Sequence, residues 1–283
     1  MAIPQAAAAA PTCLPVETGD ENTPIIHARI NDGRPFAFVL DTAASGTTLA
    51  PTRAETLALP RDTATEEAQG MGGAISVYFH PVHSLKAGPV ELRDIIVPAL
   101  PAPAFESHDV AGLAGADLFA DRLAIWRPGA SCVDLFSSGT DPAAGTWQPV
   151  EVKWLQPWKI MLPLGIDGVP GWALLDTGAQ YTTLNPAFAN AVGLTNDRLR
   201  PGGSITGIDG RELRLQEGDV GGVVLGPRHW RERRVRVGDL PVFARLGAAG
   251  DRLAILGMDW LASEGFAIDY GRQAVWLLRP PAD

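Results

Sequence analysis

The chain has 283 residues, of which 46% are hydrophobic and 19% charged, so it has the composition of an ordinary globular protein large enough for two lobes with sizeable cores. Its formal net charge of −9 argues against nucleic acid as a partner. No apolar run approaches the length that a membrane span needs.

Residues 1–22 are predicted to form an N-terminal arm, which begins with an uncharged, alanine-rich stretch. That stretch lacks the basic start of a signal peptide but fits the mature side of a cleavage point. The only two cysteines are Cys13 and Cys132. They form either a disulfide between the arm and the first lobe or two buried thiols, and the first alternative suits an oxidising compartment. A periplasmic or secreted location is therefore favoured over a cytoplasmic one, without being fixed.

Two stretches of the chain repeat one another position by position. Leu40-Asp41-Thr42 and Leu175-Asp176-Thr177 are each preceded by Asp-Gly, at residues 32–33 and 167–168. Both are followed by Thr-Thr-Leu and Pro at equal offsets, and later by hydrophobic-Gly segments that end in Asp117 and Asp259. A repeat unit of about 120 residues is a small domain rather than a solenoid repeat. The sequence therefore predicts a tandem duplication, with a first lobe at 23–136, a linker at 137–149 and a second lobe at 150–283.

Local patterns within each unit favour strands. Asp-Gly between apolar, β-branched or aromatic runs indicates a two-residue hairpin turn, which places each repeated Asp just past a buried strand. Pro186–Val192, capped by Asn185, and its counterpart Pro51–Leu57 are predicted as short helices. The rest reads as short strands, and long helical periodicity is absent. The predicted fold class is mostly β. The further predicted strands are 75–79, 90–97, 123–126, 212–215, 220–225, 233–237 and 267–270.

These motifs resemble those of the aspartic peptidases, whose signature is a hydrophobic-hydrophobic-Asp-Thr/Ser-Gly-Ala/Ser turn followed later by hydrophobic-hydrophobic-Gly. The copy at 174–179 with 255–257 matches fully, and the copy at 39–44 with 113–115 departs only in part. Lobe size and the residues after Asp-Thr look more like the retroviral-type (retropepsin-like) peptidases than pepsin. The resemblance covers about Ile25 to Leu278 and implies a fused, two-lobed, bacterial-type member with a duplicated acid-protease β-barrel fold.

The repeated aspartates suit the chemistry of that family. Hydrolysis of a peptide without a covalent intermediate needs a base that takes a proton from water and an acid that protonates the departing amine. Two adjacent carboxyl groups that share one proton supply both, so Asp41 and Asp176 are predicted jointly as the catalytic dyad. By resemblance, Thr42 and Thr177 exchange hydrogen bonds across the two turns, and amides near Ala43 and Gly178 hold the carboxylates. The alternative is that each Asp only caps a turn.

A further expectation from the resemblance is a pair of flaps, which are β-hairpins that fold over substrate and exclude water. Glycine-rich segments lie at a suitable distance after each Asp and are typical of mobile tips. The alternative is that these are ordinary glycine-rich hairpins. The predicted substrate-binding flap residues are Met71, Gly72, Gly73, Thr206, Gly207 and Ile208.

Ala43 is the one clear departure from the signature, because glycine is expected there. Its Cβ is expected to crowd the partner turn or to disfavour the required backbone angles. The main prediction is an aspartic endopeptidase that acts on a peptide or protein substrate without a cofactor, as a monomer with pseudo-two-fold symmetry. The departure keeps open a catalytically silent peptide-binding module that retains the fold. A lid-less β-barrel scaffold for protein partners is a third alternative.

Three other features are assigned structural roles. The basic run Arg228–Arg236 is interpreted as the solvated face of one amphipathic strand rather than an anion site. His80 and His83 have a metal-like spacing but lack companion ligands, so they are placed on a strand surface and no metal is predicted. Trp147, Trp154 and Trp158 either line a cleft or, as the more favoured explanation, fill the space between the lobes.

Overall fold

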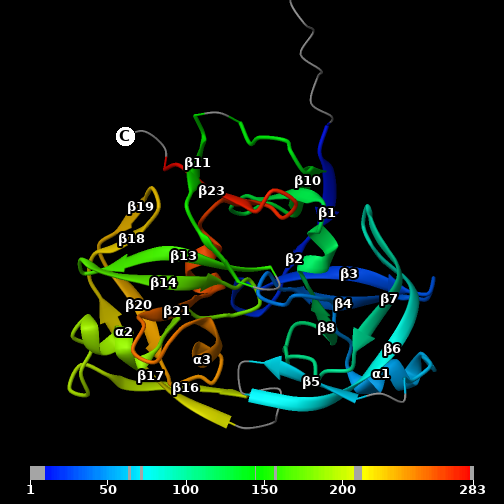
Figure 1. The fold of residues 1–283 in the computed structure, drawn as a ribbon, viewed down its shortest axis with the longest axis horizontal. Helices are drawn as coiled ribbons and strands as arrows, with labels where there is room; N and C mark the ends of the chain where they lie inside the picture. Colours follow the sequence, from blue (N-terminus) through cyan, green and yellow to red (C-terminus); the bar gives the residue numbers. More distant parts are fainter. Residues whose placement is uncertain are drawn as a thin grey trace, which may run out of the picture.

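The computed structural model describes residues 10–62, 65–70, 73–143, 145–155, 158–206 and 212–280. Within these residues the strands form three sheets, one in each lobe and one shared between them (Figure 1). The fold is mostly β with short helices, as the sequence predicts. None of the helices in the described part of the chain is long and apolar enough to cross a membrane.

The first-lobe sheet has seven strands in the order β5-β6-β3-β4-β8, with β2 added beside β3 and β7 beside β6. Its key feature is a parallel pairing of β4 with β8, which brings Leu40 opposite Ala114. Helix α1 (Pro51–Thr56) follows the turn after β4. The strands are β2 (Glu17–Thr18), β3 (Pro24–Ile30), β4 (Pro35–Leu40), β5 (Thr65–Gly70), β6 (Gly73–Ala87), β7 (Val90–Pro98) and β8 (Val110–Ala114).

The second-lobe sheet has ten strands in the order β16-β17-β20-β15-β21-β14-β13-β18-β19, with β12 beside β13. It repeats the parallel pairing, since β14 runs beside β21 and brings Leu175 opposite Leu256. The strands are β12 (Lys153–Leu155), β13 (Lys159–Ile166), β14 (Val169–Leu175), β15 (Thr183–Leu184), β16 (Arg200–Thr206), β17 (Glu212–Val220), β18 (Val223–Leu225), β19 (Arg228–Trp230), β20 (Arg233–Val237) and β21 (Leu253–Leu256).

The third sheet joins the two halves of the chain. It has six strands in the order β1-β10-β9-β22-β23-β11, and its centre is the antiparallel pairing of β9 with β22. Three strands come from the first half and three from the second. They are β1 (Thr12–Pro15), β9 (Arg122–Trp126), β10 (Cys132–Ser137), β11 (Trp147–Val150), β22 (Phe266–Asp269) and β23 (Ala274–Leu278).

The short helices lie at the ends of strands. Asn185 caps α2 (Pro186–Ala191), and its side chain accepts a hydrogen bond from the Phe188 amide. Both predicted helices are therefore present, each ending one residue earlier than predicted. The others are α3 (Phe243–Leu246), α4 (Met258–Leu261) and the 3₁₀ turns η1 (Asp20–Asn22) and η2 (Ala116–Phe119).

Hairpin turns precede both of the strands that lead to the repeated aspartates. Between β13 and β14 the left-handed residues are Asp167 and Gly168, as predicted. Between β3 and β4 they are Asn31 and Asp32, one residue earlier than the predicted Asp-Gly pair. Asn and Asp tolerate this conformation because their short polar side chains bond locally, so the turn does not need the glycine at position 33.

Two predictions about surface strands hold only in part, although β20 has the predicted bounds and alternation. The basic run forms two strands, β19 and β20, and Arg228 makes an ion pair with the buried carboxylate of Glu264. The predicted strand at 220–225 is likewise interrupted, since β17 ends at Val220 and β18 begins at Val223.

The two histidines of β6 differ. His80 is buried, and its Nδ1 lies 2.9 Å from the Pro60 carbonyl oxygen, so placing it on the strand surface was wrong. His83 is exposed beside Asp94, as expected. The alternation of side chains along a strand explains the difference, because His80 and His83 are three positions apart and therefore lie on opposite faces of β6.

Aromatic side chains pack together beside the β9–β22 pairing of the shared sheet. The ring of Tyr270 stacks on Phe119 with centroids 5.7 Å apart and meets Trp154 edge-on at 6.0 Å. Trp126 stacks on Phe266 across the β9–β22 pairing at 4.7 Å. Both halves contribute to this cluster, so the packing of large aromatic groups holds the lobes together.

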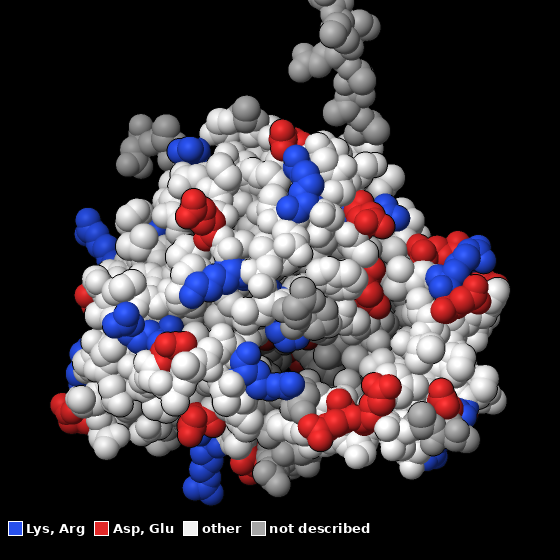
Figure 2. All heavy atoms as spheres, in the orientation of Figure 1, with Lys and Arg blue, Asp and Glu red and all other residues white. Residues whose placement is uncertain are grey.

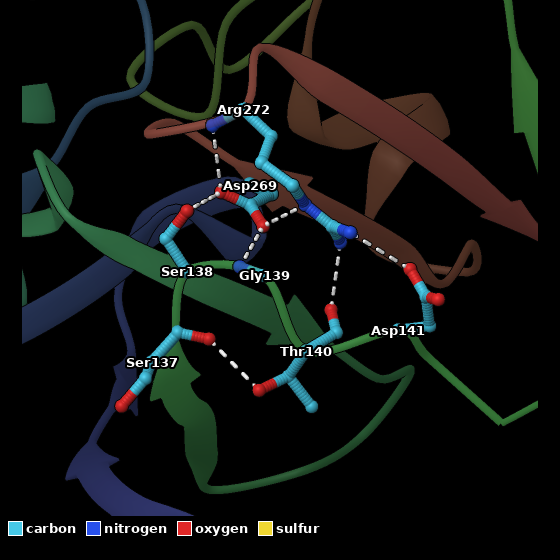
Figure 3. A network of polar contacts seen from close by, with 7 residues as sticks. All are labelled: Ser137, Ser138, Gly139, Thr140, Asp141, Asp269 and Arg272. Atoms are coloured by element: carbon cyan, nitrogen blue, oxygen red, sulfur yellow. Dashed lines mark hydrogen bonds and ion pairs between the residues drawn. The ribbon is translucent and has the colours of Figure 1, made fainter.

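The segment predicted as the linker is tied to the second half by Asp269, which is fully buried (Figure 3). Its carboxylate accepts hydrogen bonds from Ser138 Oγ at 2.6 Å, the Gly139 amide at 2.9 Å and Arg272 Nε at 2.7 Å. Burial alone would raise the pKa of Asp269, but these donors hold it below its usual value. Strand β11 begins at Trp147, inside the predicted linker, so the linker is not free of regular structure. The boundaries of the two lobes stay a prediction.

Cys13 and Cys132 form a disulfide that joins β1 to β10 across a sequence separation of 119 residues. The predicted alternative of two buried thiols is therefore not the one observed. The bridge fastens the N-terminal arm to the edge of the shared sheet, where β1 pairs with β10.

Replacing both cysteines by serine is expected to lower the free energy of unfolding by about 2–5 kcal/mol, because the bridge closes a long loop in the unfolded chain. Urea unfolding of the variant and of the wild type under non-reducing conditions measures this. Reduction of the wild type is the control and should reproduce the loss. Equal stability of variant and oxidised wild type would contradict a structural role for the bridge.

Candidate active site

Each repeated Asp stands at the carboxyl end of a strand, where the parallel neighbour fixes its backbone. The amide of Asp41 donates to the Ala114 carbonyl at 2.9 Å, and the amide of Asp176 donates to the Leu256 carbonyl at 3.2 Å. The two turns therefore leave their sheets in the same way. Figure 2 shows that the molecule is hollowed near the centre of this face, with basic side chains on one rim and acidic ones on another.

The structure brings the two aspartates together. Their carboxyl groups lie within hydrogen-bonding reach of each other. Asp176 is buried, whereas Asp41 is partly exposed. Side chains that lie 135 positions apart in the chain thus form one carboxyl pair between the lobes.

Backbone amides hold both carboxyl groups in an equivalent manner. Asp41 Oδ1 accepts from the amides of Ala43 at 2.7 Å and Ala44 at 3.0 Å. Asp176 Oδ1 accepts from the amides of Gly178 at 2.9 Å and Ala179 at 3.0 Å. One oxygen of each carboxyl group is thereby held by the turn, so the other oxygen stays available to the partner carboxyl group.

Thr42 and Thr177 exchange hydrogen bonds across the two turns. The Thr42 amide donates to Thr177 Oγ1 at 3.0 Å, and the Thr177 amide donates to Thr42 Oγ1 at 3.1 Å. Each hydroxyl then donates to a carbonyl of the opposite lobe, Leu175 for Thr42 at 2.9 Å and Leu40 for Thr177 at 2.6 Å. Both threonines are buried, so these four bonds are shielded from water and fix the distance between the turns.

The position that follows Asp-Thr differs between the turns. A Cβ at Gly178 would lie 2.6 Å from Asp41 Cγ and 2.7 Å from its Oδ2, so only glycine fits there. Ala43 instead packs its methyl group against the apolar cluster of the second lobe. Neither residue has a positive φ, and the Ala43 amide keeps its bond to Asp41. The expected conflict with the backbone angles is therefore wrong for Ala43.

The environment raises the pKa of both carboxyl groups. Burial is the largest cause for each, because it disfavours the charged form. The negative charge of Asp41 then raises the pKa of Asp176 further, well above the usual value. The amides of Ala43 and Ala44 and the nearby Lys159 act in the opposite direction on Asp41. The pair consequently holds one proton more readily than two isolated aspartates would.

Comparison with known proteins agrees with this geometry. A family model described as aspartyl protease matches residues 26–118 and again 162–260, about two thirds of the chain, and each match contains one Asp of the pair. The chain belongs to the aspartyl protease family. A search of curated proteins found no match.

In this member of the family, a second pair of carboxylates supports the turns. Asp117 accepts from the Thr47 amide at 2.8 Å and from Thr47 Oγ1 at 3.0 Å. Asp259 accepts from the Thr182 amide and from Thr182 Oγ1, both at 2.8 Å. Burial raises the pKa of both, to about 6 for Asp259. Each lies two positions after the glycine of the later hydrophobic-Gly segment, Gly115 or Gly257, but no role was predicted for them.

Lys159, the first residue of β13, was missed by the sequence analysis. Its Nζ donates to Ser45 Oγ at 3.1 Å, and its charge acts on both Asp41 and Asp176. Burial lowers its pKa, although the two aspartates oppose that effect. A comparison of the two copies for unmatched charged residues would have found it, because the equivalent position in the first copy is Pro24.

The predicted flap segments fall on two hairpins, β5–β6 and β16–β17. Both extend toward the lower middle of Figure 1. Gly73 begins β6 with a φ of 138°, a conformation that favours glycine, and Thr206 ends β16. Met71, Gly72, Gly207 and Ile208 lie outside the described residues, so their role stays a prediction.

Replacement of Gly178 by alanine is expected to destabilise the protein by about 1–3 kcal/mol, because the new methyl group overlaps the buried carboxyl of Asp41. The matched control is Ala43→Gly, which only removes a methyl group and should cost less than about 1 kcal/mol. Thermal and urea unfolding measure both. Equal effects of the two substitutions would show that the turns are not crowded in the way described.

Replacement of Thr177 by valine is expected to cost about 2–4 kcal/mol, because it removes one hydroxyl that accepts from Thr42 and donates to Leu40. Thr177→Ser keeps the hydroxyl and should lose only about 1 kcal/mol with the methyl group. Denaturant unfolding of both variants decides the point. A serine variant as unstable as the valine variant would assign the effect to packing instead.

Proposed function

We propose that this protein is an aspartic endopeptidase in which a water molecule between Asp41 and Asp176 attacks the peptide bond. The observation that carries the proposal is the hydrogen-bonded carboxyl pair between the lobes, held at equal geometry by four backbone amides. The family membership supports the same activity. We also infer that the two lobes arose by tandem duplication, since one model matches both.

The dyad provides the base and the acid that hydrolysis needs. One ionised carboxyl group takes a proton from water as the water oxygen bonds to the substrate carbonyl carbon, while the protonated partner donates to the carbonyl oxygen. When the C–N bond breaks, the departing amine takes up the proton that came from water. The carboxyl partner regains its own proton from the hydroxyl group, so the dyad returns to its starting state.

The supporting residues have matching roles in the proposal. Thr42 and Thr177 keep the two turns at a fixed separation, and the amides at Ala43 and Gly178 orient the carboxyl groups. The hairpins β5–β6 and β16–β17 act as flaps that close over a peptide or protein substrate and exclude water. No cofactor takes part, and the chain acts as a monomer because it carries both aspartates itself.

A catalytically silent peptide-binding module is the second candidate, because Ala43 departs from the signature. The contacts of Ala43 favour the enzyme, since its amide still donates to Asp41 and its backbone is unstrained. Binding of a pepstatin-type inhibitor without turnover of any peptide would favour the module instead. Neither binding nor turnover would favour a scaffold for protein partners.

Asp176→Asn and Asp41→Asn are each expected to lower kcat/KM by at least about 10²–10⁴-fold, because either change removes the exchange of one proton between two carboxyl groups. A peptide-library digest from acidic to neutral pH measures cleavage. Asp32→Asn, the same substitution at an exposed turn, is the matched control and should retain activity. Equal turnover by wild type and Asp176→Asn would refute the proposed function.

A further inference from the structure

The backbone treats the two aspartates alike, so it does not decide which of them carries the negative charge. Each carboxyl group accepts two amide hydrogen bonds at 2.7–3.0 Å, and the threonine exchange has the same pattern on both sides. These backbone bonds therefore favour neither arrangement of one shared proton. A preference comes from features that differ between the two sides, which are the greater exposure of Asp41 and any charged group that lies on one side only.

Lys159 is such a group. It begins β13, the antiparallel neighbour of the strand β14 that ends just before Asp176, and it precedes Asp176 by 17 positions. The residue 17 positions before Asp41 is Pro24, which begins β3 in the first lobe. The two strands are equivalent, but only one of them brings a charge to the site.

The contact of Lys159 crosses between the lobes. Its ammonium group donates to Ser45 Oγ at 3.1 Å, and Ser45 lies four residues after Asp41 in the same turn. The cation of the second lobe is thereby attached to the turn of the first-lobe aspartate. Its charge lowers the pKa of Asp41.

Other ionisable groups near the pair do not replace this cation. The charge of Arg245 in α3 disfavours the charged form of Lys159, whereas both aspartates favour it. The buried hydroxyl of Tyr270 also feels the charge of Asp41. Its pKa is raised by burial and by that charge, so it stays neutral. Lys159 therefore brings a positive charge to the pair, and its hydrogen bond to Ser45 attaches that charge to the turn of Asp41.

We propose that Lys159 is a positioning residue that breaks the symmetry of the dyad, holding the negative charge on Asp41 and the proton on Asp176. This inference rests on the proposed function for its catalytic meaning. Asp41 then acts as the base toward water, and Asp176 acts as the acid toward the substrate carbonyl. Lys159 itself exchanges no proton with the substrate.

The test is a site-resolved titration of the two carboxyl groups by ¹³C NMR in wild type, Lys159→Met and Lys159→Arg. Asp41→Asn and Asp176→Asn assign the two signals. In the wild type, Asp41 should ionise first and Asp176 should keep its proton to higher pH. In Lys159→Met the first ionisation should move up by roughly one pH unit and be shared more evenly by both sites. Lys159→Arg should behave like the wild type.

Enzyme kinetics give a second readout. The acid limb of the kcat/KM profile should move up by about one pH unit in Lys159→Met, which is roughly a tenfold loss at a fixed pH on that limb. An unchanged titration in Lys159→Met would overturn the inference even if Asp176→Asn is inactive, so the proposed function would stand alone. A wild type without peptidase activity would refute the function, and the NMR titration would still decide the role of Lys159.

Discussion

The hydrogen bonds between Thr42 and Thr177 are the interaction on which the site depends. Each threonine uses both its amide and its hydroxyl group to bind the opposite lobe, and the bonds are buried. Two carboxyl groups with raised pKa values do not hold each other in place by themselves, because removing them from water costs free energy. The threonine exchange provides the fixed geometry within which that cost is tolerated.

Other parts of the fold support this contact from progressively greater distances. Asp117 and Asp259 hold the far end of each turn through Thr47 and Thr182. The parallel pairings of β4 with β8 and β14 with β21 fix where each turn leaves its sheet. The six-stranded sheet and its aromatic cluster then hold the lobes against each other. Local rigidity and the relative position of the lobes therefore come from different parts of the chain.

Prediction from the sequence worked best where a pattern is local or repeated. Asn185 followed by proline identified α2, and the matching offsets around Asp41 and Asp176 identified the pair. Prediction failed for His80 and held for only part of the basic run, since burial depends on which neighbouring strand covers a face. It also missed Lys159. Matching the two copies finds only the residues that they share, and Lys159 has no counterpart in the first copy. Its contact with Ser45 also spans 114 positions, so no local pattern reveals it.

The sequence by itself determined the family signature, the mostly β character and the identity of the paired aspartates, because these depend on residue type and spacing within each copy. The tertiary structure alone decided that a disulfide joins Cys13 to Cys132, that Ala43 is accommodated where Gly178 could not be replaced without overlap, and that one cation lies beside a symmetric pair. These properties depend on distances between segments far apart in the chain, and such distances are set by packing rather than by local sequence.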